Sequence, residues 1–414
     1  MSSDKGRTRR PLVVASIMLA TFMNAIEATI VATAMPHIVG ELGGFLYYSW
    51  VFSAFLLAQT TTNVIYGKLA DIFGRKPILI GGMLLFLLGS LLCGVASTMF
   101  LLIGFRLLQG LGAGAIQPVT TTIVGDLYTL EERPRVQGIL SGVWAMSAVI
   151  GPLAGALIVD HLPWAWIFWV NLPIGVVSIA GFSLFLHETV SYRGRRIDYL
   201  GAALFCVAVV SLLVILTGVP PSILAPLGAV FLLSAALFLW QETRAPEPMI
   251  SLGLWSRRLI ATSNTATLLA GMALIGLTTV LPLYVQGVLG RSPVVAGFTL
   301  TMLVLGWPLA VTLSGRLFRA FGIRNTLRGG SVAFPLGGAL LVMLTPQSHP
   351  VLAGLASFVM GVGMGLSSVT CIILIQEGVE WSMRGSATAS NIFARSLGTT
   401  LGATVLGAVL NFGI

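Results

Sequence analysis

The feature that most constrains the fold of this 414-residue chain is a series of thirteen long apolar stretches. A helix that crosses a bilayer needs about 20 mostly apolar residues, and a spanning segment must satisfy its own backbone hydrogen bonds. We therefore expect thirteen membrane-spanning helices. Their approximate limits are Leu12–Met35, Tyr47–Tyr66, Ile78–Ala96, Phe100–Val124, Val136–Val159, Trp166–Leu186, Tyr199–Thr217, Ser222–Trp240, Leu259–Val285, Val295–Leu317, Gly329–Leu344, Val351–Ile375 and Ala387–Leu410.

The composition excludes several classes of protein. Only 9% of the residues are charged, whereas a soluble domain has about 25%. A soluble enzyme, a disordered chain and a nucleic-acid-binding domain are therefore not expected. Cys93, Cys206 and Cys371 lie in apolar runs and form no cluster with the four histidines, so we predict neither a disulfide framework nor a metal site.

The basic residues predict the orientation. With the N-terminus in the cytoplasm, Arg291 is the only Lys or Arg in an outer loop, and Arg106 and Arg395 lie inside spans. All the others fall at the N-terminus or in inner loops, as the positive-inside rule requires. The net charge of +9 thus reflects topology, and we expect a multi-pass protein of the inner (cytoplasmic) membrane with no nucleic-acid partner.

An internal repeat divides the chain. Residues 67–77 (GKLADIFGRKP) and 315–324 (GRLFRAFGIR) share their first glycine, a leucine and a second glycine followed by a basic residue. We predict an N-terminal six-helix bundle (1–190), two extra central helices (191–245) and a C-terminal bundle (246–414) with five spans. Thirteen is one short of fourteen, so either the count is off by one or a last span is lacking. Repeated halves are the usual plan of secondary transporters.

Several motifs resemble those of the major facilitator superfamily. Residues 67–77 resemble its motif A, 106–110 its motif B, and the glycines and proline of 142–155 its antiporter motif C; residues 26–36 and 169–175 are similar to the fourteen-span drug:proton antiporters. The resemblance implies an all-α integral membrane fold, with two pseudo-symmetric bundles plus two central helices. It also implies transport driven by a proton gradient, without a cofactor. The family usually has aspartate where Glu27 stands.

Glu27 and Arg106 are the candidate proton-coupling residues. Charges inside a membrane are costly and mark functional sites, and these two lie about 13 and 10 Å below the outer surface at about 1.5 Å per residue. A low-dielectric surrounding favours the neutral carboxyl and a guanidinium favours the carboxylate, so Glu27 could load and release a proton. The resemblance assigns Arg106 to this coupling. The alternative is a permanent ion pair that joins two helices.

Polar residues at helical spacing predict a substrate cavity, because lipid would leave them unpaired. Hydrogen bonds between packed helices are the alternative for any single amide. A mostly apolar pocket with few polar groups suits a lipophilic or amphipathic ligand. The predicted lining residues are Asn24, Phe52, Phe55, Gln59, Asn63, Gln109, Gln117, Asn391 and Arg395.

Motif A is interpreted as a gate. Asp71 can meet the positive N-terminus of a helix or a nearby arginine, and Asp126 is within reach of Arg75. The predicted gate residues are Gly67, Asp71, Gly74, Arg75 and Asp126.

Motif C predicts a flat, bent fifth span. Its glycines remove side chains and its proline removes a helix hydrogen bond, so we expect close packing against the opposite half. The residues are Gly142, Gly151, Pro152 and Gly155.

The leading interpretation is an antiporter that exports lipophilic or cationic small molecules, a multidrug efflux protein working by alternating access. Export of one dedicated lipid, siderophore or antibiotic stays open, as does a non-transporting membrane sensor or scaffold. No Ser/His, HExxH or paired-carboxylate pattern indicates an enzyme. The expected partners are a lipophilic substrate, protons and the bilayer, and we expect a monomer.

Overall fold

The computed structural model describes residues 8–188, 198–216, 220–245, 248 and 252–412, which form helices and connecting turns with no strand among them. The α-helices are α1 (Arg10–Leu42), α2 (Tyr48–Phe73), α3 (Arg75–Gly94), α4 (Met99–Leu127), α5 (Arg133–His161), α6 (Trp166–Trp169), α7 (Asn171–Phe185), α8 (Tyr199–Leu216), α9 (Pro221–Arg244), α10 (Leu252–Trp255), α11 (Arg258–Leu283), α12 (Pro293–Val342), α13 (Pro350–Glu377) and α14 (Arg384–Phe412). Three short helical turns adjoin them: η1 (Phe45–Tyr47), the π-helical η2 (Tyr284–Val288) and η3 (Trp381–Met383).

The all-helical prediction is confirmed, and every predicted span coincides with helix. The stretch beginning at Trp166 is divided between α6 and α7, and α12 contains two of the predicted spans. Inside α12 the backbone of Gly322 is non-helical (φ 77°, ψ 158°), a conformation that glycine adopts at little cost. Gly322 is the second glycine of the repeated GRLFRAFG pattern, and the break explains why two spans appear within one long helix.

Ten helices of the described chain are long and apolar enough to cross a membrane. Residues Val295–Val342 of α12 contain two of the predicted spans but count as one of these ten helices. Helices α2 and α14 are not among the ten. Helix α2 carries Gln59, three threonines and Asn63, and α14 carries several Ser, Thr and Asn residues. These polar residues lower the hydropathy of both helices.

Contacts divide the chain into two units. Unit 1 comprises Met1–Leu127, Met146–Ser256 and Glu380–Phe393, and unit 2 comprises Tyr128–Ala145, Arg257–Val379 and Ala394–Ile414. The start of α14 therefore belongs to unit 1 and the rest of that helix to unit 2. Compactness is a different property from repeat symmetry, so the predicted division at 190 and 245 stays a prediction.

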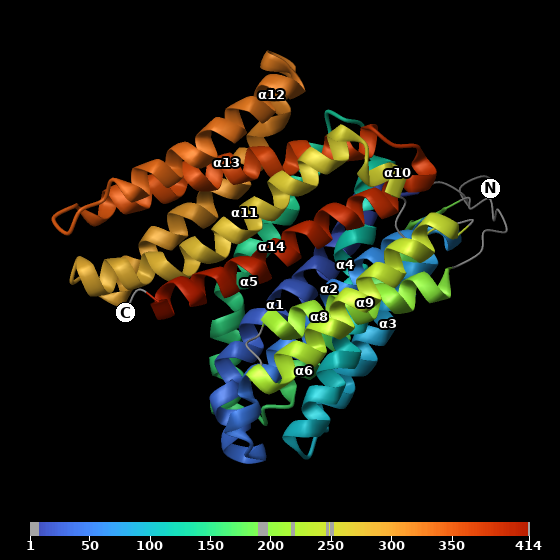
Figure 1. The fold of residues 1–414 in the computed structure, drawn as a ribbon, viewed down its shortest axis with the longest axis horizontal. Helices are drawn as coiled ribbons and strands as arrows, with labels where there is room; N and C mark the ends of the chain where they lie inside the picture. The colour runs from blue at the N-terminus through green and yellow to red at the C-terminus, as the bar shows by residue number, and fades with distance from the viewer. Residues whose placement is uncertain (1–7, 189–197, 217–219, 246–247, 249–251, 413–414) are drawn as a thin grey trace, which may run out of the picture. The chain divides into compact units, whose positions relative to one another are not determined.

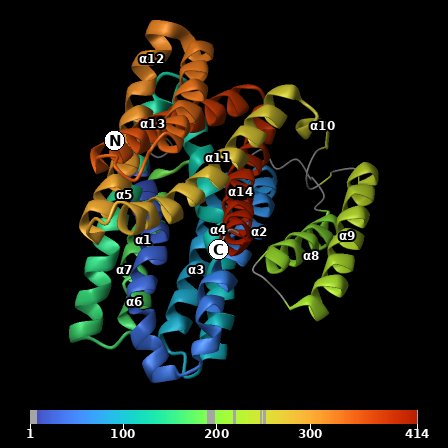
Figure 2. The ribbon, with the colours of Figure 1, turned by 60° about the vertical axis from the view of Figure 1, so that its left-hand side comes forward.

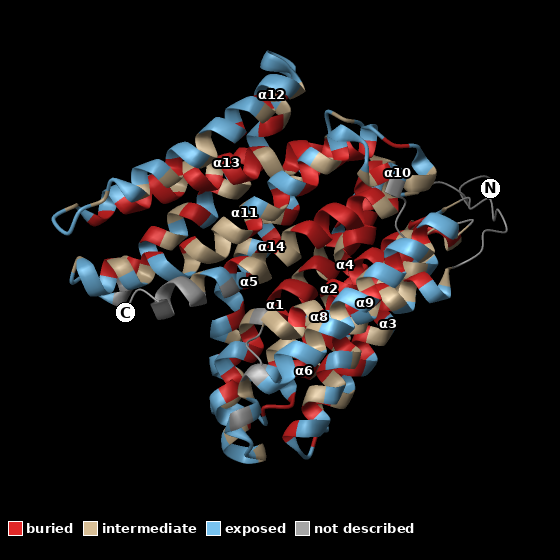
Figure 3. Cartoon of the chain, viewed as in Figure 1, coloured by how far each residue is buried: buried red, intermediate tan, exposed pale blue. Residues whose placement is uncertain are grey.

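In unit 1, α4 packs closely against both α2 and α3. The glycine run of α4 permits this approach, because a Cβ at Gly112 would lie 2.2 Å from the backbone nitrogen of Phe86. These glycines (Gly110, Gly112 and Gly114) therefore serve helix packing. Helix α1 packs along α7 (Figure 2). The interior is dense, and Figure 3 shows α4 buried along much of its length.

The two central helices form a hairpin in unit 1. Helices α8 and α9 run side by side (Figure 1), and α8 also packs on α2. The ring of Phe205 lies 5.5 Å from the ring centroids of both Phe238 and Phe393, so aromatic contacts join the hairpin internally and to the first part of α14.

Unit 2 is built on the α12–α13 pair, with α11 packed against both helices. Its core is apolar and includes Leu277, Leu303 and Met360. Small residues allow α13 to approach α12, since a Cβ at Gly361 would lie 2.4 Å from the carbonyl oxygen of Leu303. This arrangement places α11, α12, α13 and the second part of α14 around the pocket of unit 2 that is described below.

Candidate functional site

Glu27 and Arg106 form a fully buried ion pair in unit 1. Their side chains are 0% and 1% exposed, and Arg106 Nη1 contacts Glu27 Oε1. The guanidinium also donates to the carbonyl of Val51 at 3.1 Å and to Gln109 Oε1 at 2.8 Å, and it lies 4.2 Å from the ring centroid of Phe55. The two charges predicted at similar depth therefore meet. This contact fits both interpretations of the sequence, a proton site and a permanent ion pair that joins two helices.

The other oxygen of Glu27 is held by a residue that the site prediction missed. Asn171, at the start of α7, donates from Nδ2 to Glu27 Oε2 at 2.6 Å and to Ser90 Oγ at 3.0 Å. Ser90 accepts from Gln109 Nε2 at 3.1 Å and donates to the Phe168 carbonyl at 2.8 Å. Side chains from α1, α3, α4 and α7 thus form one connected polar network. The WVNLPIG segment was the available signal, but it was used only for the family resemblance.

The predicted cavity residues of unit 1 mostly engage one another. Gln59 Nε2 donates to Asn24 Oδ1 at 3.1 Å. The Asn63 amide, with its oxygen and nitrogen exchanged, donates to the carbonyls of Gln59 at 3.1 Å and Gly114 at 3.0 Å. Asn24, Asn63 and Gln109 are each at most 5% exposed. The alternative of hydrogen bonds between packed helices therefore holds for these three amides. Phe52 and Gln117 are partly exposed.

The motif A residues form a buried charge cluster. Asp71 accepts hydrogen bonds from the backbone N–H groups of Gly385 (2.9 Å) and Ser386 (2.7 Å) and from the Ser386 hydroxyl (2.8 Å). Arg75 Nη2 lies 3.1 Å from Asp71 Oδ1, and Arg75 Nε lies 3.1 Å from Asp126 Oδ2. Both predicted partners of Asp71 are present, because the carboxylate caps the N-terminus of α14 and pairs with an arginine.

Further contacts bind the start of α14 to this cluster. Arg75 donates to the carbonyl of Trp381 at 2.9 Å and lies 3.9 Å from its ring centroid. Arg384 Nη1 lies 3.3 Å from Asp126 Oδ1. Gly67 lets the helices touch, since a Cβ there would lie 2.3 Å from the Cβ of Ala389. The motif A cluster, by which we mean Asp71, Arg75, Asp126, Trp381 and Arg384, therefore ties α2, α3 and α4 to the beginning of α14.

The motif C glycines pack differently from the prediction. A Cβ at Gly151 would lie 1.9 Å from Thr29 Oγ1, and one at Gly155 would lie 3.1 Å from the Ile30 carbonyl. Both neighbours are on α1, whereas the expectation was packing against the opposite half. A Cβ at Gly142 would meet nothing within 4 Å. Pro152 lies inside α5 as expected. The glycine of α5 that packs on α12 is Gly138, whose Cβ would lie 2.4 Å from Thr312 Oγ1. It was not among the predicted residues.

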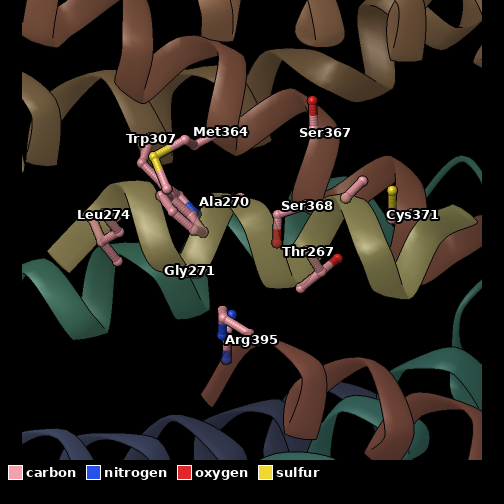
Figure 4. Close-up of a pocket in the computed structure, with 11 residues that line it drawn as sticks. Thr267, Ala270, Gly271, Leu274, Trp307, Met364, Ser367, Ser368, Cys371 and Arg395 are labelled. Atoms are coloured by element: carbon pink, nitrogen blue, oxygen red, sulfur yellow. The ribbon is translucent and has the colours of Figure 1, made fainter. Parts of the chain in front are cut away.

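A pocket lies in unit 2 between α11, α12, α13 and α14 (Figure 4). Arg395 is the predicted cavity residue that lines it, and Asn391 is buried one turn earlier on α14. The other lining residues are Ala266, Thr267, Ala270, Gly271, Leu274, Trp307, Met364, Ser367, Ser368 and Cys371.

Comparison with known proteins identifies the family of this chain. The model of the Major Facilitator Superfamily matches residues 17–403. The chain belongs to the major facilitator superfamily. It is 36% identical over 403 residues to multidrug resistance protein 3 of Bacillus subtilis, covering 96% of this chain and 79% of the relative. It is 33% identical over 417 residues to the multidrug transporter protein MdtP of the same organism, covering 99% and 77%.

Solved structures of superfamily members share the fold. The human organic anion transporter MFSD10 superposes with a TM-score of 0.68 at 16% identity, covering 97% of this chain and 94% of that one. The proton:xylose symporter XylE superposes with a TM-score of 0.67 at 10% identity, covering 97% and 89%. At these identities the likeness concerns the fold alone. The chain is thus a multi-pass membrane protein of a transporter superfamily, with multidrug transporters among its relatives.

Proposed function

We propose that this chain is a proton-coupled exporter of lipophilic or cationic small molecules, and that Glu27 is its proton site. The observation that carries the proposal is the burial of Glu27 with both oxygens engaged, one by Arg106 and one by Asn171. A carboxyl group in such a place has two accessible states. As a carboxylate it is stabilised by the arginine, and as a neutral acid it is favoured by the low dielectric.

Protonation of Glu27 would change the network in a defined way. The neutral acid no longer balances Arg106, whose guanidinium then relies on Gln109 and the Val51 carbonyl. Because Asn171 and Gln109 both contact Ser90, a change at Glu27 reaches α1, α3, α4 and α7 together. This connection gives proton binding a route to helix movement, as alternating access requires.

For a neutral lipophilic substrate, the energy of one proton is sufficient for export. An inward-moving proton releases about 2.3 kcal/mol through 100 mV, which corresponds to about a fifty-fold concentration ratio of the substrate. The similarity to Bacillus multidrug transporters supports a broad, lipophilic substrate range. Inside the inner membrane the protein would act as an antiporter, with its N-terminus in the cytoplasm.

We also propose that the motif A cluster is the cytoplasmic gate. Asp71 holds the N-terminus of α14 through two backbone N–H groups and a hydroxyl. Releasing these contacts would free the start of α14 from α2. The buried position of Asp71 and Arg75 makes the contact sensitive to any change of charge, because a buried charge without its partner is strongly unfavourable.

The test of proton coupling is substrate-driven proton flux in proteoliposomes. Glu27→Gln keeps the size of the side chain and removes its titration, so we expect substrate-driven proton movement to vanish in protein that size-exclusion chromatography shows to be folded. Asp160→Asn, at the exposed end of α5, is the matched control and should keep wild-type flux. Undiminished proton flux in Glu27→Gln would refute the assignment.

A further inference from the structure

Arg395 is an arginine within the predicted membrane span of α14. Within the described residues, its guanidinium makes no hydrogen bond or ion pair, and its backbone carbonyl accepts the Thr399 hydroxyl at 2.9 Å. Arginine stays protonated in proteins. A charge within a membrane helix normally faces a partner or an aqueous cavity, so the lone guanidinium of Arg395 requires an explanation.

The sequence supplies no acidic partner in the surrounding helices. Neither 257–376 nor 394–414 contains an Asp or a Glu. Glu377 follows at the end of α13, where its carboxylate lies 2.7 Å from Arg133 Nη1. Apart from Glu377, which pairs with Arg133, the helices of unit 2 around Arg395 therefore contain no carboxylate to balance its charge.

The pocket around Arg395 has a polar side and an apolar side. Thr267 and Ser368 contribute hydroxyls, whereas Ser367 lines the pocket with its hydroxyl pointing away from Arg395 (Figure 4). The structure shows no hydrogen bond of the Ser367 or Ser368 side chain to any residue that it describes. On the other side stand the apolar side chains of Leu274, Trp307 and Met364 (Figure 4).

A glycine brings Arg395 to the pocket. A Cβ at Gly271 of α11 would lie 2.5 Å from the Arg395 carbonyl oxygen, so α14 approaches α11 closely only because this side chain is absent. A close contact of this kind fixes the backbone from which the guanidinium extends. The cation is thus held against the pocket by packing.

We propose that this pocket binds the anionic group of an amphipathic substrate, a carboxylate, sulfonate or phosphate, with Arg395 as its counter-ion. The planar guanidinium matches such groups with two parallel hydrogen bonds, and the Ser368 hydroxyl adds a donor. The apolar wall takes the hydrophobic part of the same molecule. Among the lipophilic compounds of the proposed function, the inference selects amphipathic anions in place of cations. It rests on that function in one respect, that the pocket lies on the transport path.

The test is a binding measurement on a matched pair of probes. The full chain in phosphatidylcholine nanodiscs is titrated with the environment-sensitive dye dansylaminoundecanoate and with its methyl ester, which lacks the charge. Empty nanodiscs correct for partition into lipid. We expect the wild type to bind the acid more tightly than the ester. Arg395→Gln should weaken acid binding by about tenfold or more and leave ester binding unchanged.

Two further variants separate recognition from structure. Arg395→Lys keeps the charge and should recover part of the affinity for the acid. Arg328→Gln removes an exposed arginine of α12 and should bind both probes like the wild type. An equal loss of acid and ester binding in Arg395→Gln, with no recovery by lysine, would show a purely structural arginine. Equal wild-type affinities for acid and ester would also overturn the proposal.

The same titration identifies the source of the anion. If phosphatidylglycerol in the nanodisc competes with the acid in the wild type but not in Arg395→Gln, the pocket accepts a lipid headgroup. If it does not compete, the pocket selects a free amphipathic anion. No proton gradient is used, so failure of proton coupling at Glu27 and failure of anion binding at Arg395 are separate results.

Discussion

Each unit of this transporter contains an arginine on a polar helix face, and the two arginines have different surroundings. Arg106 in unit 1 is 1% exposed and contacts a carboxylate, an amide, a backbone carbonyl and an aromatic ring. Arg395 in unit 2 has no such contact with the described residues. A network in which every group is satisfied stabilises the fold, whereas local exceptions are expected where function requires them. The comparison separates a paired centre, for which we propose proton binding, from an unpaired centre, for which we propose ligand binding.

Removing Arg106 should give the largest effect, because it leaves Glu27 buried without its counter-charge. Breaking one partner of a buried ion pair costs about 3–5 kcal/mol. We expect Arg106→Ala to lower the midpoint of thermal unfolding in detergent strongly and to shift the pH dependence of transport. Arg106→Lys should retain part of both properties.

The same substitution at Arg395 tests the comparison directly. Arg395→Ala removes a charge that has no partner, so its unfolding midpoint should stay close to that of the wild type. Equal destabilisation by Arg106→Ala and Arg395→Ala would show that the two arginines are equally embedded. A double variant, Glu27→Gln with Arg106→Gln, should be more stable than Arg106→Ala, since it leaves no lone buried charge.

Substitution of Asp71 should have the second largest effect. It extends the comparison to the other paired charges of unit 1. Asp71→Asn loses the ion pair with Arg75 and the charge on the hydrogen bonds to Gly385 and Ser386. Hydrogen bonds to a charged group contribute about 1.5–3 kcal/mol. We expect the start of α14 to detach more often from α2.

Cysteine labelling measures this detachment. Gln59→Cys on α2 should react faster with a maleimide reagent from the cytoplasmic side when Asp71→Asn is added. Glu132→Gln, an exposed acid before α5, is the control with unchanged labelling. Unaltered labelling in the Asp71→Asn background would contradict the gating role of the motif A cluster.

Much of the fold was predictable from local sequence properties, whereas the side-chain contacts within the site were only partly predictable. Long apolar runs predicted every span, because lipid allows few other structures. Asp71 and Arg75 were predictable, since a carboxylate at the end of one helix near a basic residue has few partners to choose from. Glu27 and Arg106 were predictable as rare membrane charges of similar depth.

Contacts between distant spans were not predictable in the same way. Asn171 and Ser90 are ordinary polar residues, and which helix face meets Glu27 depends on how four helices pack. The motif C glycines indicated close packing but not the partner, which is α1 for Gly151 and Gly155. Polar stripes predicted a cavity, yet the Gln59 amide donates to Asn24 and the Asn63 amide donates to the backbone carbonyls of Gln59 and Gly114, because amides find partners on adjacent helices when the helices touch.

Substitution of Asn171 should have a smaller effect than substitution of Asp71. It tests the polar network around Glu27 and Arg106. Its Oδ1 is buried without a partner in the described structure, whereas its Nδ2 binds Glu27. Asn171→Ala removes one donor to the carboxylate and should cost about 1–3 kcal/mol. Since it leaves Arg106 in place, transport should persist with an altered pH profile. A wild-type pH profile in this variant would exclude Asn171 from the proton site.

The smallest effect on stability is expected in the open centre. Ser367 and Ser368 line the Arg395 pocket, and their hydroxyls form no hydrogen bond that the described residues provide. Replacing both by alanine breaks no such bond, so the unfolding midpoint should change by less than the equivalent of about 0.5 kcal/mol. Binding of dansylaminoundecanoate should nevertheless weaken a few-fold, because the Ser368 donor to the anion is lost. Thr278→Ala on α11, where the hydroxyl bonds its own helix at 3.0 Å, is the control and should leave acid binding unchanged. If the double alanine substitution lowered stability more than it weakened anion binding, this part of unit 2 would belong to the closed, structural networks. The contrast between the two arginines would then reduce to a difference in packing.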